Sequence, residues 1–319
     1  MKTVTVLGAG GRLGGQAAEA FLRAGWRVRA VVRNAAGKNL VAGAEIVEAD
    51  ALERRSLMAA CEGARVIFNG LNPLYTDWKE RVMPMARNVM AAAQATGATH
   101  IFPGNVYNYG REIPRVAGPE TPQHGSTRKG AIRIEMEELF AQTAEREGVQ
   151  TIILRAGDFY GGDRRGSWFD LAIAAKIGKG VFTYPGPMDL PHAWAYLPDL
   201  GRAFVALAER RDTLARFDRF TFAGHTMTGA ELKALCEQVI GRGLRHAGMP
   251  WAVIRAGGVI YPMWREITEM AYLWSRPHAL SGDRLASVTG ALVSTPAPQA
   301  VANALAGLGV EAGEVARSA

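Results

Sequence analysis

The first fifteen residues, MKTVTVLGAGGRLGG, constrain the fold of this chain more than any other segment. Val4, Val6 and Leu7 form a short apolar run typical of a buried β-strand, and a glycine-rich turn follows at once. An amphipathic helical pattern then covers residues 16–23. A strand, a glycine-rich turn and a helix N-terminus in this order are the context in which proteins bind dinucleotides. The alternative is that the glycine-rich loop only turns the chain.

The glycines Gly8, Gly11 and Gly14 are spaced three residues apart, with Gly10 as an additional glycine. The first permits a tight turn, the second lets the backbone approach a pyrophosphate, and the third lets the helix lie close to the strand. The free N–H groups and the positive end of the helix dipole then hold the phosphates. The residues expected to contact the cofactor here are Gly8, Gly10, Gly11, Arg12, Leu13 and Gly14.

Strand and helix patterns alternate through the first half of the chain, which predicts a doubly wound parallel α/β sheet with helices on both faces. After the first strand, strands are expected at 27–32, 45–48, 65–68, 100–102, 151–154 and, returning late to the sheet, 219–222. Helices are expected at 78–95, 126–147, 167–177, 199–210, 229–240 and 251–274.

The second half of the chain is rich in glycine, proline and aromatic residues, which indicates a region of different character. We therefore predict a Rossmann domain of residues 1–160 plus 193–225. A smaller, mainly helical substrate-covering region is expected to consist of residues 161–192 plus 226–319.

The composition is that of an ordinary soluble protein, with 48% hydrophobic and 21% charged residues. The net charge of +7 is spread without a block of like charge, so no nucleic-acid partner is expected. Cys61 and Cys236 lie far apart, which favours reduced, buried thiols in the cytoplasm. The fold begins at residue 3, so no signal peptide is expected. The apolar stretch 251–274 is interrupted by charges and does not predict a membrane span.

The residues after the second strand indicate which dinucleotide would bind. An acidic residue there accepts from the 2′-hydroxyl of NAD, whereas basic residues bind the 2′-phosphate of NADP. No acidic residue occurs between Arg23 and Glu45, whereas Arg33 and Lys38 follow the strand. Together with Arg12 they give three cations for one phosphate, although each alone also fits a solvated surface residue. The sequence favours NADP(H), with NAD(H) as the alternative.

The glycine spacing and several later segments resemble the extended and atypical short-chain dehydrogenase/reductases, which include NAD-dependent epimerases and dehydratases. Ala49-Asp50-Ala51, after the third strand, resembles the segment that contacts adenine. Asn69-Gly70-Leu71-Asn72 ends the fourth strand, at the edge where such sheets bind ligands. The alternative for both segments is a plain turn. The cofactor contacts expected here are Asp50, Ala51, Asn69, Gly70 and Leu71.

Reductases that this chain resembles carry a Ser at the end of the fifth strand, and a Tyr four residues before a Lys. The Tyr transfers the proton, while the Lys lowers its pKa and holds the nicotinamide ribose. Here Asn105 occupies the Ser position in IFPGNVYNYG, and no tyrosine stands four residues before Lys129. The candidate catalytic residues are Asn105, His124 as a replacement proton donor, Lys129 and Tyr109. The alternative is that Lys129 and Arg133 form a solvated helix face, with Arg133 paired to Glu137.

Two further segments resemble the substrate side of these proteins. In LRAGDFYG the residues before Tyr-Gly, Asp158 and Phe159, are expected to flank the nicotinamide. His192 stands where an Arg commonly binds a sugar-nucleotide diphosphate, which makes such a substrate less favoured. Tyr107, Tyr160, His192 and Trp194 are expected to line the substrate pocket. We predict an aromatic, largely apolar pocket; the alternative is that the aromatic residues pack internally.

The resemblance implies an NADP(H)-dependent oxidoreductase that transfers hydride to a small apolar carbonyl, imine or enone. We expect a cytoplasmic monomer or homodimer without a membrane partner. The histidines and cysteines show no metal-ligand spacing, so no metal is expected. Two alternatives remain open: an NAD-dependent sugar-nucleotide epimerase or dehydratase, and a non-catalytic NADP(H)-binding redox sensor. The missing Tyr-x-x-x-Lys pair makes the sensor credible, whereas His124 and His192 weaken the epimerase or dehydratase interpretation.

Overall fold

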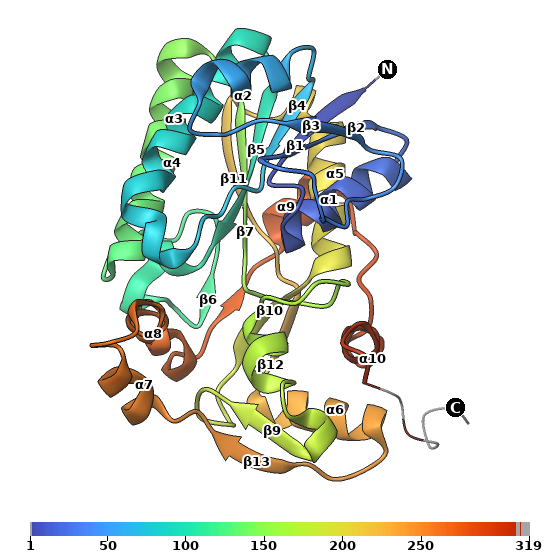
Figure 1. The fold of residues 1–319 in the computed structure, drawn as a ribbon, viewed down its shortest axis with the longest axis vertical. Coiled ribbons are helices and arrows are strands. Elements are labelled where there is room, and N and C mark those ends of the chain that lie inside the picture. Colours follow the sequence, from blue (N-terminus) through green and yellow to red (C-terminus); the bar gives the residue numbers. More distant parts are fainter. Residues whose placement is uncertain (1, 311–312, 314–319) are drawn as a thin grey trace.

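A seven-stranded parallel sheet forms the centre of the molecule in the computed structural model, which describes residues 2–310 and 313 (Figure 1). The strand order β11-β7-β5-β4-β1-β2-β3 confirms the predicted doubly wound sheet. The strands are β1 (Thr3–Leu7), β2 (Arg27–Val32), β3 (Glu45–Glu48), β4 (Val66–Asn69), β5 (Thr99–Asn105), β7 (Thr151–Ala156) and β11 (Phe217–Thr221).

Helices cover both faces of this sheet (Figure 1). One face carries α2 (Arg54–Cys61), α3 (Trp78–Thr96) and α4 (Arg128–Glu147), and the other carries α1 (Arg12–Arg23), α5 (Leu197–Arg210) and α9 (Asp283–Thr289). Although α9 lies within the predicted substrate-covering region, it packs against α5 and β11.

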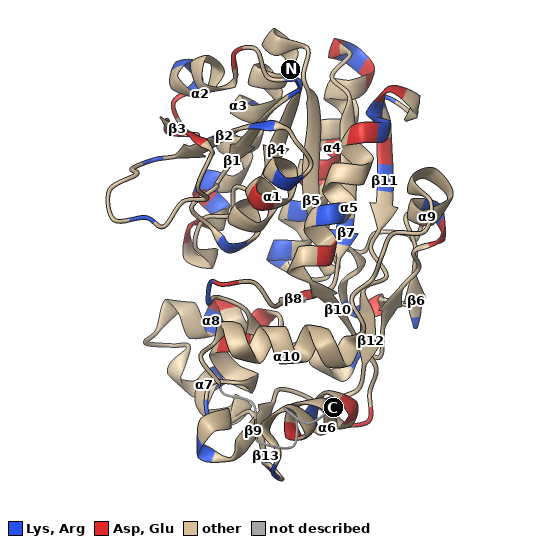
Figure 2. Ribbon diagram, turned by 90° about the vertical axis from the view of Figure 1, so that its right-hand side faces the viewer, with Lys and Arg blue, Asp and Glu red and all other residues tan. Residues whose placement is uncertain are grey.

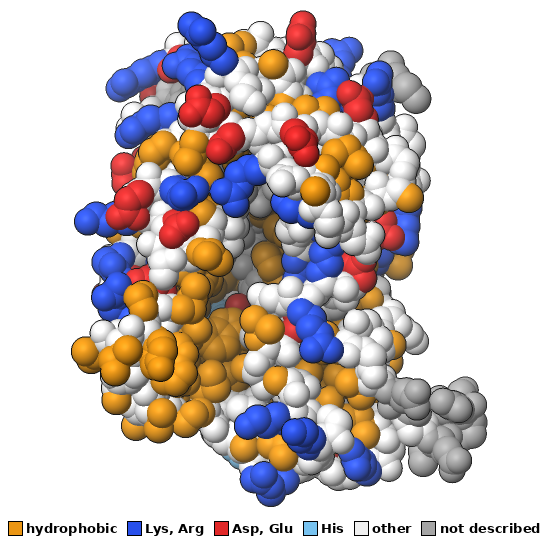
Figure 3. Space-filling model, viewed as in Figure 1, with side chains coloured by type: hydrophobic (Ala, Val, Ile, Leu, Met, Phe, Trp, Pro, Cys, Tyr) orange, Lys and Arg blue, Asp and Glu red, His pale blue; other side chains and the backbone are white. Residues whose placement is uncertain are grey.

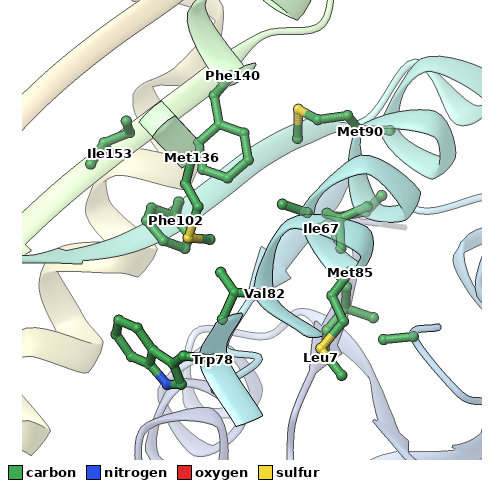
Figure 4. Packing of buried hydrophobic residues seen from close by; sticks show 14 of the residues in the cluster. Leu7, Ile67, Trp78, Val82, Met85, Met90, Phe102, Met136, Phe140 and Ile153 are labelled. Atoms are coloured by element: carbon green, nitrogen blue, oxygen red, sulfur yellow. The ribbon is translucent and has the colours of Figure 1, made fainter. Parts of the chain in front are cut away.

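The core between the sheet and α3 shows why these elements form (Figure 4). Leu7, Ile67 and Phe102 project from strands whose residues are buried on both faces. Trp78 and Val82 lie one helical turn apart on α3 and face them. Packing of this kind fixes the carboxyl ends of β1, β4 and β5 relative to one another.

The parts of the second half of the chain that do not join the central sheet or its covering helices form most of the lower lobe in Figure 1, from small sheets and short helices. Three small sheets are formed by β8 (Asp158–Tyr160) with β10 (His192–Tyr196) and β12 (His225–Met227), β9 (Val181–Tyr184) with β13 (Arg245–Gly248), and β6 (Val116–Ala117) with β14 (Ala279–Leu280). The helices are α6 (Gly229–Ile240), α7 (Trp251–Gly257), α8 (Pro262–Glu269) and α10 (Ala297–Gly307).

The helix expected over 251–274 is instead a hairpin of α7 and α8, followed by a 3₁₀ turn at Ala271–Ser275. A Cβ on Gly257 would lie 2.3 Å from the Trp264 ring, so the glycine is what lets the two helices pack closely. Pro262 opens the second helix at a position where its missing N–H costs nothing. The helix expected over 167–177 is likewise shorter, a π-helical segment at Phe169–Ile173 and a 3₁₀ turn at Ile177–Lys179.

The described residues contain no helix with the length and apolar character that a bilayer crossing requires. They also contain no group of three or more His, Cys, Asp or Glu side chains arranged to hold a metal ion. Cys61 and Cys236 are both buried and unpaired, as the sequence indicated. Burial raises the pKa of each thiol to about 12. Residues 311–312 and 314–319 of the predicted substrate-covering region lie outside the described residues.

Candidate active site

The glycine-rich turn lies where the strand order reverses, between the carboxyl ends of β1 and β4. Gly8 has a φ of +73°, and a Cβ there would lie 2.7 Å from the Gly70 carbonyl oxygen. A Cβ on Gly14 would lie 2.3 Å from the Gly8 carbonyl oxygen. Helix α1 begins after Gly11 without a side-chain cap, so the amides of its first turn are not blocked by a side chain. These are the features of an anion site at a helix N-terminus.

Two cations follow β2 on a loop that projects beside the sheet and contains no acidic residue between residues 33 and 44 (Figure 2). Arg33 and Lys38 are both exposed. Lys38 lies over the glycine-rich turn, since a Cβ on Gly10 would be 3.4 Å from its Nζ. Among the described residues, no carboxylate forms an ion pair with either side chain.

Arg12, the third cation predicted to bind the 2′-phosphate, points away from Arg33 and Lys38. Its guanidinium donates to the Gly161 carbonyl at 2.7 Å and forms an ion pair with Asp170 at 3.2 Å. Burial lowers the pKa of Arg12, and Asp170 opposes that shift. The prediction that Arg12 joins Arg33 and Lys38 was therefore wrong, because a carboxylate distant in sequence binds it.

The residues expected to contact the cofactor after β3 and β4 lie at the carboxyl ends of these strands, where their polar atoms contact other groups of the chain. Asp50 accepts from the Leu52 amide at 2.9 Å, and the Ala51 carbonyl accepts from Asn88 at 2.9 Å. Asn69 is buried and lies 3.2 Å from the His100 ring. A Cβ on Gly70 would lie 2.9 Å from the Leu7 carbonyl oxygen, so these two strand ends touch through backbone alone.

Two tyrosines meet at the ends of β4 and β5. The hydroxyl of Tyr107, two residues after β5, lies 2.8 Å from the hydroxyl of Tyr75 in the 3₁₀ turn Tyr75–Asp77. The Lys129 ammonium lies 5.0 Å from the centre of the Tyr75 ring. We call Tyr75, Tyr107 and Lys129 the tyrosine–lysine cluster. Sequence reasoning missed Tyr75, whose one signal was its place six residues beyond the end of β4.

Both tyrosines are held in their protonated state. Burial raises the pKa of Tyr75, and the hydrogen bond with Tyr107 only partly offsets that rise. Burial also raises the pKa of Tyr107, with Tyr75 and Asp158 adding to the effect. Tyr107 is buried whereas Tyr75 keeps part of its surface exposed. The pair therefore presents a neutral hydroxyl that is able to donate a hydrogen bond.

Lys129 is buried and does not form a solvated helix face. Its ammonium donates to Glu266 and, at 2.7 Å, to Glu269, and its backbone N–H donates to Glu269 at 3.0 Å. Burial alone would raise the pKa of each carboxyl, but the hydrogen bonds from Lys129 bring both below the ordinary value. Helix α8 is thereby tied to the start of α4.

Arg133 is also buried and is not paired with Glu137 as the alternative interpretation required. Its guanidinium lies 4.9 Å from the Trp78 ring centre and 5.1 Å from that of Phe102. Glu137 instead accepts from Arg155 and, at 3.0 Å, from Asn108.

A second polar pair, Asp158 with His192, follows β7. The His192 Nε2 lies 2.7 Å from an Asp158 carboxylate oxygen. The imidazole stacks on Trp274 with 4.3 Å between ring centres and meets the His278 ring edge-on at 4.5 Å. Burial lowers the pKa of His278 to about 4, so this second imidazole is neutral at physiological pH.

Three candidate catalytic residues are not in this arrangement. The His124 ring is half exposed and lies 3.6 Å from the exposed Glu112 carboxylate. Tyr109 is fully buried and donates to the Gly118 carbonyl at 3.0 Å. The Asn105 side-chain oxygen accepts from the Tyr107 amide at 3.0 Å, as in a plain turn. The geometry gives none of the three a catalytic position, because each is engaged in local structure or points to solvent.

The predicted substrate aromatics divide into two groups. Tyr160 and Trp194 are fully buried in a closed aromatic core, where the Tyr160 hydroxyl lies 2.6 Å from His225, so they pack internally. Phe159 is partly buried, and Tyr107 belongs to the tyrosine–lysine cluster. Figure 3 shows a hollow below the sheet that hydrophobic side chains border, with acidic and histidine atoms at its floor.

Residues 1–148 match the NmrA-like family. Among curated proteins no sequence matches. The structure of UDP-glucose 4-epimerase from Brucella ovis in complex with NAD superimposes with a TM-score of 0.77 at 17% identity, covering 98% of this chain and 100% of that one. The chain has the fold of the extended short-chain dehydrogenase/reductase superfamily.

Two more structures with this fold are similar along nearly the whole chain. A putative epimerase from Burkholderia cenocepacia gives a TM-score of 0.76 at 17% identity, covering 96% of this chain and 97% of that one. A nucleoside-diphosphate-sugar epimerase from Staphylococcus aureus gives 0.68 at 14% identity, covering 95% and 100%. The resemblance drawn from the glycine spacing and the later motifs is thus confirmed at the level of superfamily fold.

Proposed function

We propose that this chain is an NADP(H)-dependent oxidoreductase that reduces a small, apolar carbonyl, imine or enone. The observation that carries the proposal is the tyrosine–lysine cluster at the same sheet edge as the glycine-rich turn. The NAD bound by the Brucella ovis epimerase supports a nicotinamide dinucleotide. Arg33 and Lys38, which lack carboxylate partners among the described residues, support the 2′-phosphorylated form.

In this proposal the residues around the glycine-rich turn hold the cofactor. Gly8, Gly11 and Gly14 admit the pyrophosphate, and the first-turn amides of α1, from Leu13 onward, donate to it. Lys38, which lies over Gly10, binds the 2′-phosphate. The remaining contacts are assigned to Arg33, Asp50, Ala51, Asn69, Gly70, Leu71, Asp158 and Phe159.

A bound nicotinamide would supply a hydride to the substrate carbon, so the chain must supply a proton to the oxygen or nitrogen. Tyr75 is suited to that step because its hydroxyl is neutral and fixed by Tyr107, and because its side chain keeps part of its surface exposed. The nearby Lys129 ammonium stabilises the negative charge that remains on Tyr75 after the proton leaves. Tyr75 and Lys129 thus take the roles of the missing Tyr-x-x-x-Lys pair.

A sugar-nucleotide substrate fits this site poorly. At the position where related proteins carry a diphosphate-binding cation stands His192, which is buried, paired with Asp158 and stacked on Trp274. A diphosphate would have to be desolvated there without a free cation. We therefore assign the substrate to small apolar compounds.

A non-catalytic NADP(H) sensor is the second candidate, and one observation favours it. The Lys129 ammonium is already bound by two carboxylates, Glu266 and Glu269. A ribose hydroxyl would have to share or replace them, so cofactor binding would change the contact between α4 and α8, as a sensor requires.

The first prediction concerns the cofactor. NADPH is expected to bind at least about tenfold more tightly than NADH. The 2′-phosphate contacts must then contribute about 1.4 kcal/mol to the binding free energy. Titration of the protein with each nucleotide, followed by fluorescence, measures both dissociation constants. Equal affinities, or tighter binding of NADH, would contradict the NADP assignment.

The second prediction separates enzyme from sensor. Lys129→Ala is expected to lower turnover by about tenfold or more while NADPH affinity changes less, because the ammonium stabilises charge that develops during the reaction. A screen of aldehydes, ketones, imines and enones with NADPH must first identify a substrate. The exposed Lys79→Ala variant serves as the control. Tight NADPH binding without oxidation of NADPH across the panel would favour the sensor.

A further inference from the structure

A cation that sequence reasoning did not consider lies on the glycine-rich turn. Arg164 belongs to the loop between β8 and the turn at Phe169–Ile173, and its guanidinium reaches back across the molecule. It donates to the carbonyl oxygens of Gly11 at 2.8 Å and Ala9 at 3.0 Å. A Cβ on Gly15 would lie 2.7 Å from this guanidinium. Arg164 therefore covers the first turns of α1 from outside the Rossmann core.

The same guanidinium also donates to the carbonyl of Asn39. Asn39 follows Lys38, whose ammonium lies over Gly10. Arg164 thus joins the glycine-rich turn to the loop that carries the other two cations. A phosphate between these elements would meet cations from two separate segments of the chain, the loop that carries Arg164 and the loop that carries Arg33 and Lys38.

Arg164 has no counter-charge of its own within the part of the chain that the structure describes. Its partners are backbone carbonyls, although it is half-buried. Arg12 extends in the opposite direction, from the glycine-rich turn to the Gly161 carbonyl. Unlike Arg164, it forms an ion pair with a carboxylate, that of Asp170. A half-buried guanidinium with only neutral acceptors binds an anion more strongly than it binds those acceptors.

The loop that carries Arg164 is held in place by the same Asp170. Its carboxylate accepts from the backbone N–H groups of Gly166 and Ser167, each at 3.0 Å. Because Asp170 also pairs with Arg12, the two loops are fixed to each other through a buried ion pair. The contacts of Asp170 therefore hold the backbone of the Arg164 loop in place.

We infer that Arg164 is a specificity-determining residue that binds the 2′-phosphate of NADP(H) together with Arg33 and Lys38. It replaces Arg12 as the third cation of that site and exchanges its backbone carbonyl partners for phosphate oxygens. A dianionic phosphate accepts from several charge-assisted donors at once, and the fork of an arginine suits it. The inference rests on the proposed NADP(H) function and names a residue supplied from outside the Rossmann core.

The test compares cofactors that differ only in the 2′-phosphate. Arg164→Ala is expected to weaken NADPH binding by about tenfold or more and NADH binding by less than about threefold. Arg164→Lys is expected to recover part of the loss, because it keeps the charge without the fork. Titrations of 2′,5′-ADP and ADP repeat the comparison without the nicotinamide. The control is Arg165→Ala, since Arg165 donates instead to the Leu308 carbonyl at 3.0 Å.

The outcomes separate this inference from the proposed function. A wild-type protein that prefers NADPH, with an Arg164→Ala variant that prefers it equally, overturns the inference alone. Equal weakening of NADPH and NADH by the substitution also overturns it, because that pattern indicates a structural role of the loop. A wild-type protein that does not bind NADPH overturns both. Thermal unfolding of each variant shows whether the fold is intact.

Discussion

Replacing Arg155 with leucine is expected to lower the free energy of unfolding by about 3–5 kcal/mol, because it leaves a buried carboxylate without its charged partner. Arg155 is fully buried in β7 and donates through two nitrogens to Glu137 of α4. A third nitrogen donates to the Tyr109 hydroxyl at 3.1 Å. Burial would lower the pKa of Arg155, but Glu137 and Tyr109 raise it above its ordinary value, so the charge persists.

Urea unfolding of wild-type and variant proteins measures this effect. The matched control is Arg219→Ala, whose pair with the exposed Glu120 spans 3.3 Å and should contribute less than about 1 kcal/mol. The double variant Arg155→Leu/Glu137→Leu should be more stable than the sum of the single losses predicts, since no charge is left unpaired. If Arg155→Leu lowers the free energy of unfolding by less than about 1 kcal/mol, the contacts of Arg155 with Glu137 and Tyr109 contribute little to stability.

The sheet could be predicted from the sequence because its signals are local. Strands 27–32 and 45–48 and helix 229–240 were predicted with the bounds that the structure shows. Apolar runs, glycine turns and helical periodicity are read within a few residues. The prediction of one continuous helix over 251–274 was wrong, and the reason is also local. Gly257 and Pro262 divide the apolar segment into two helices.

The site was predicted less completely because its contacts join distant segments. Arg12 follows Gly11 and Arg164 lies two residues from Gly162 and Gly166, and only the fold shows which of the two arginines pairs with a carboxylate. Lys129 lies in the first turn of α4, within the helix predicted from the sequence, but its partner Glu266 lies 137 residues away. Tyr109 was predicted to be catalytic from its motif. Its hydroxyl instead accepts a hydrogen bond from Arg155 and donates one to the Gly118 carbonyl.

Tyr75→Phe is expected to lower turnover by about a hundredfold or more with little change in NADPH affinity, if this side chain donates the proton. The substitution removes one hydroxyl and keeps the ring over which the Lys129 ammonium lies. It leaves the glycine-rich turn and its cations untouched. The effect should therefore appear in kcat, because the lost interaction matters in the transition state more than in binding.

The companion variants decide whether Tyr75 or its neighbour carries the proton. Tyr107→Phe should have a smaller effect, since Tyr107 is buried and its hydroxyl orients Tyr75, whose side chain keeps part of its surface exposed. Tyr261→Phe, on the exposed tip of the α7–α8 hairpin, should leave turnover unchanged. A larger loss in Tyr107→Phe than in Tyr75→Phe would transfer the donor role to Tyr107. Full turnover in both variants would remove the two tyrosines from the mechanism and contradict the proposed proton donor.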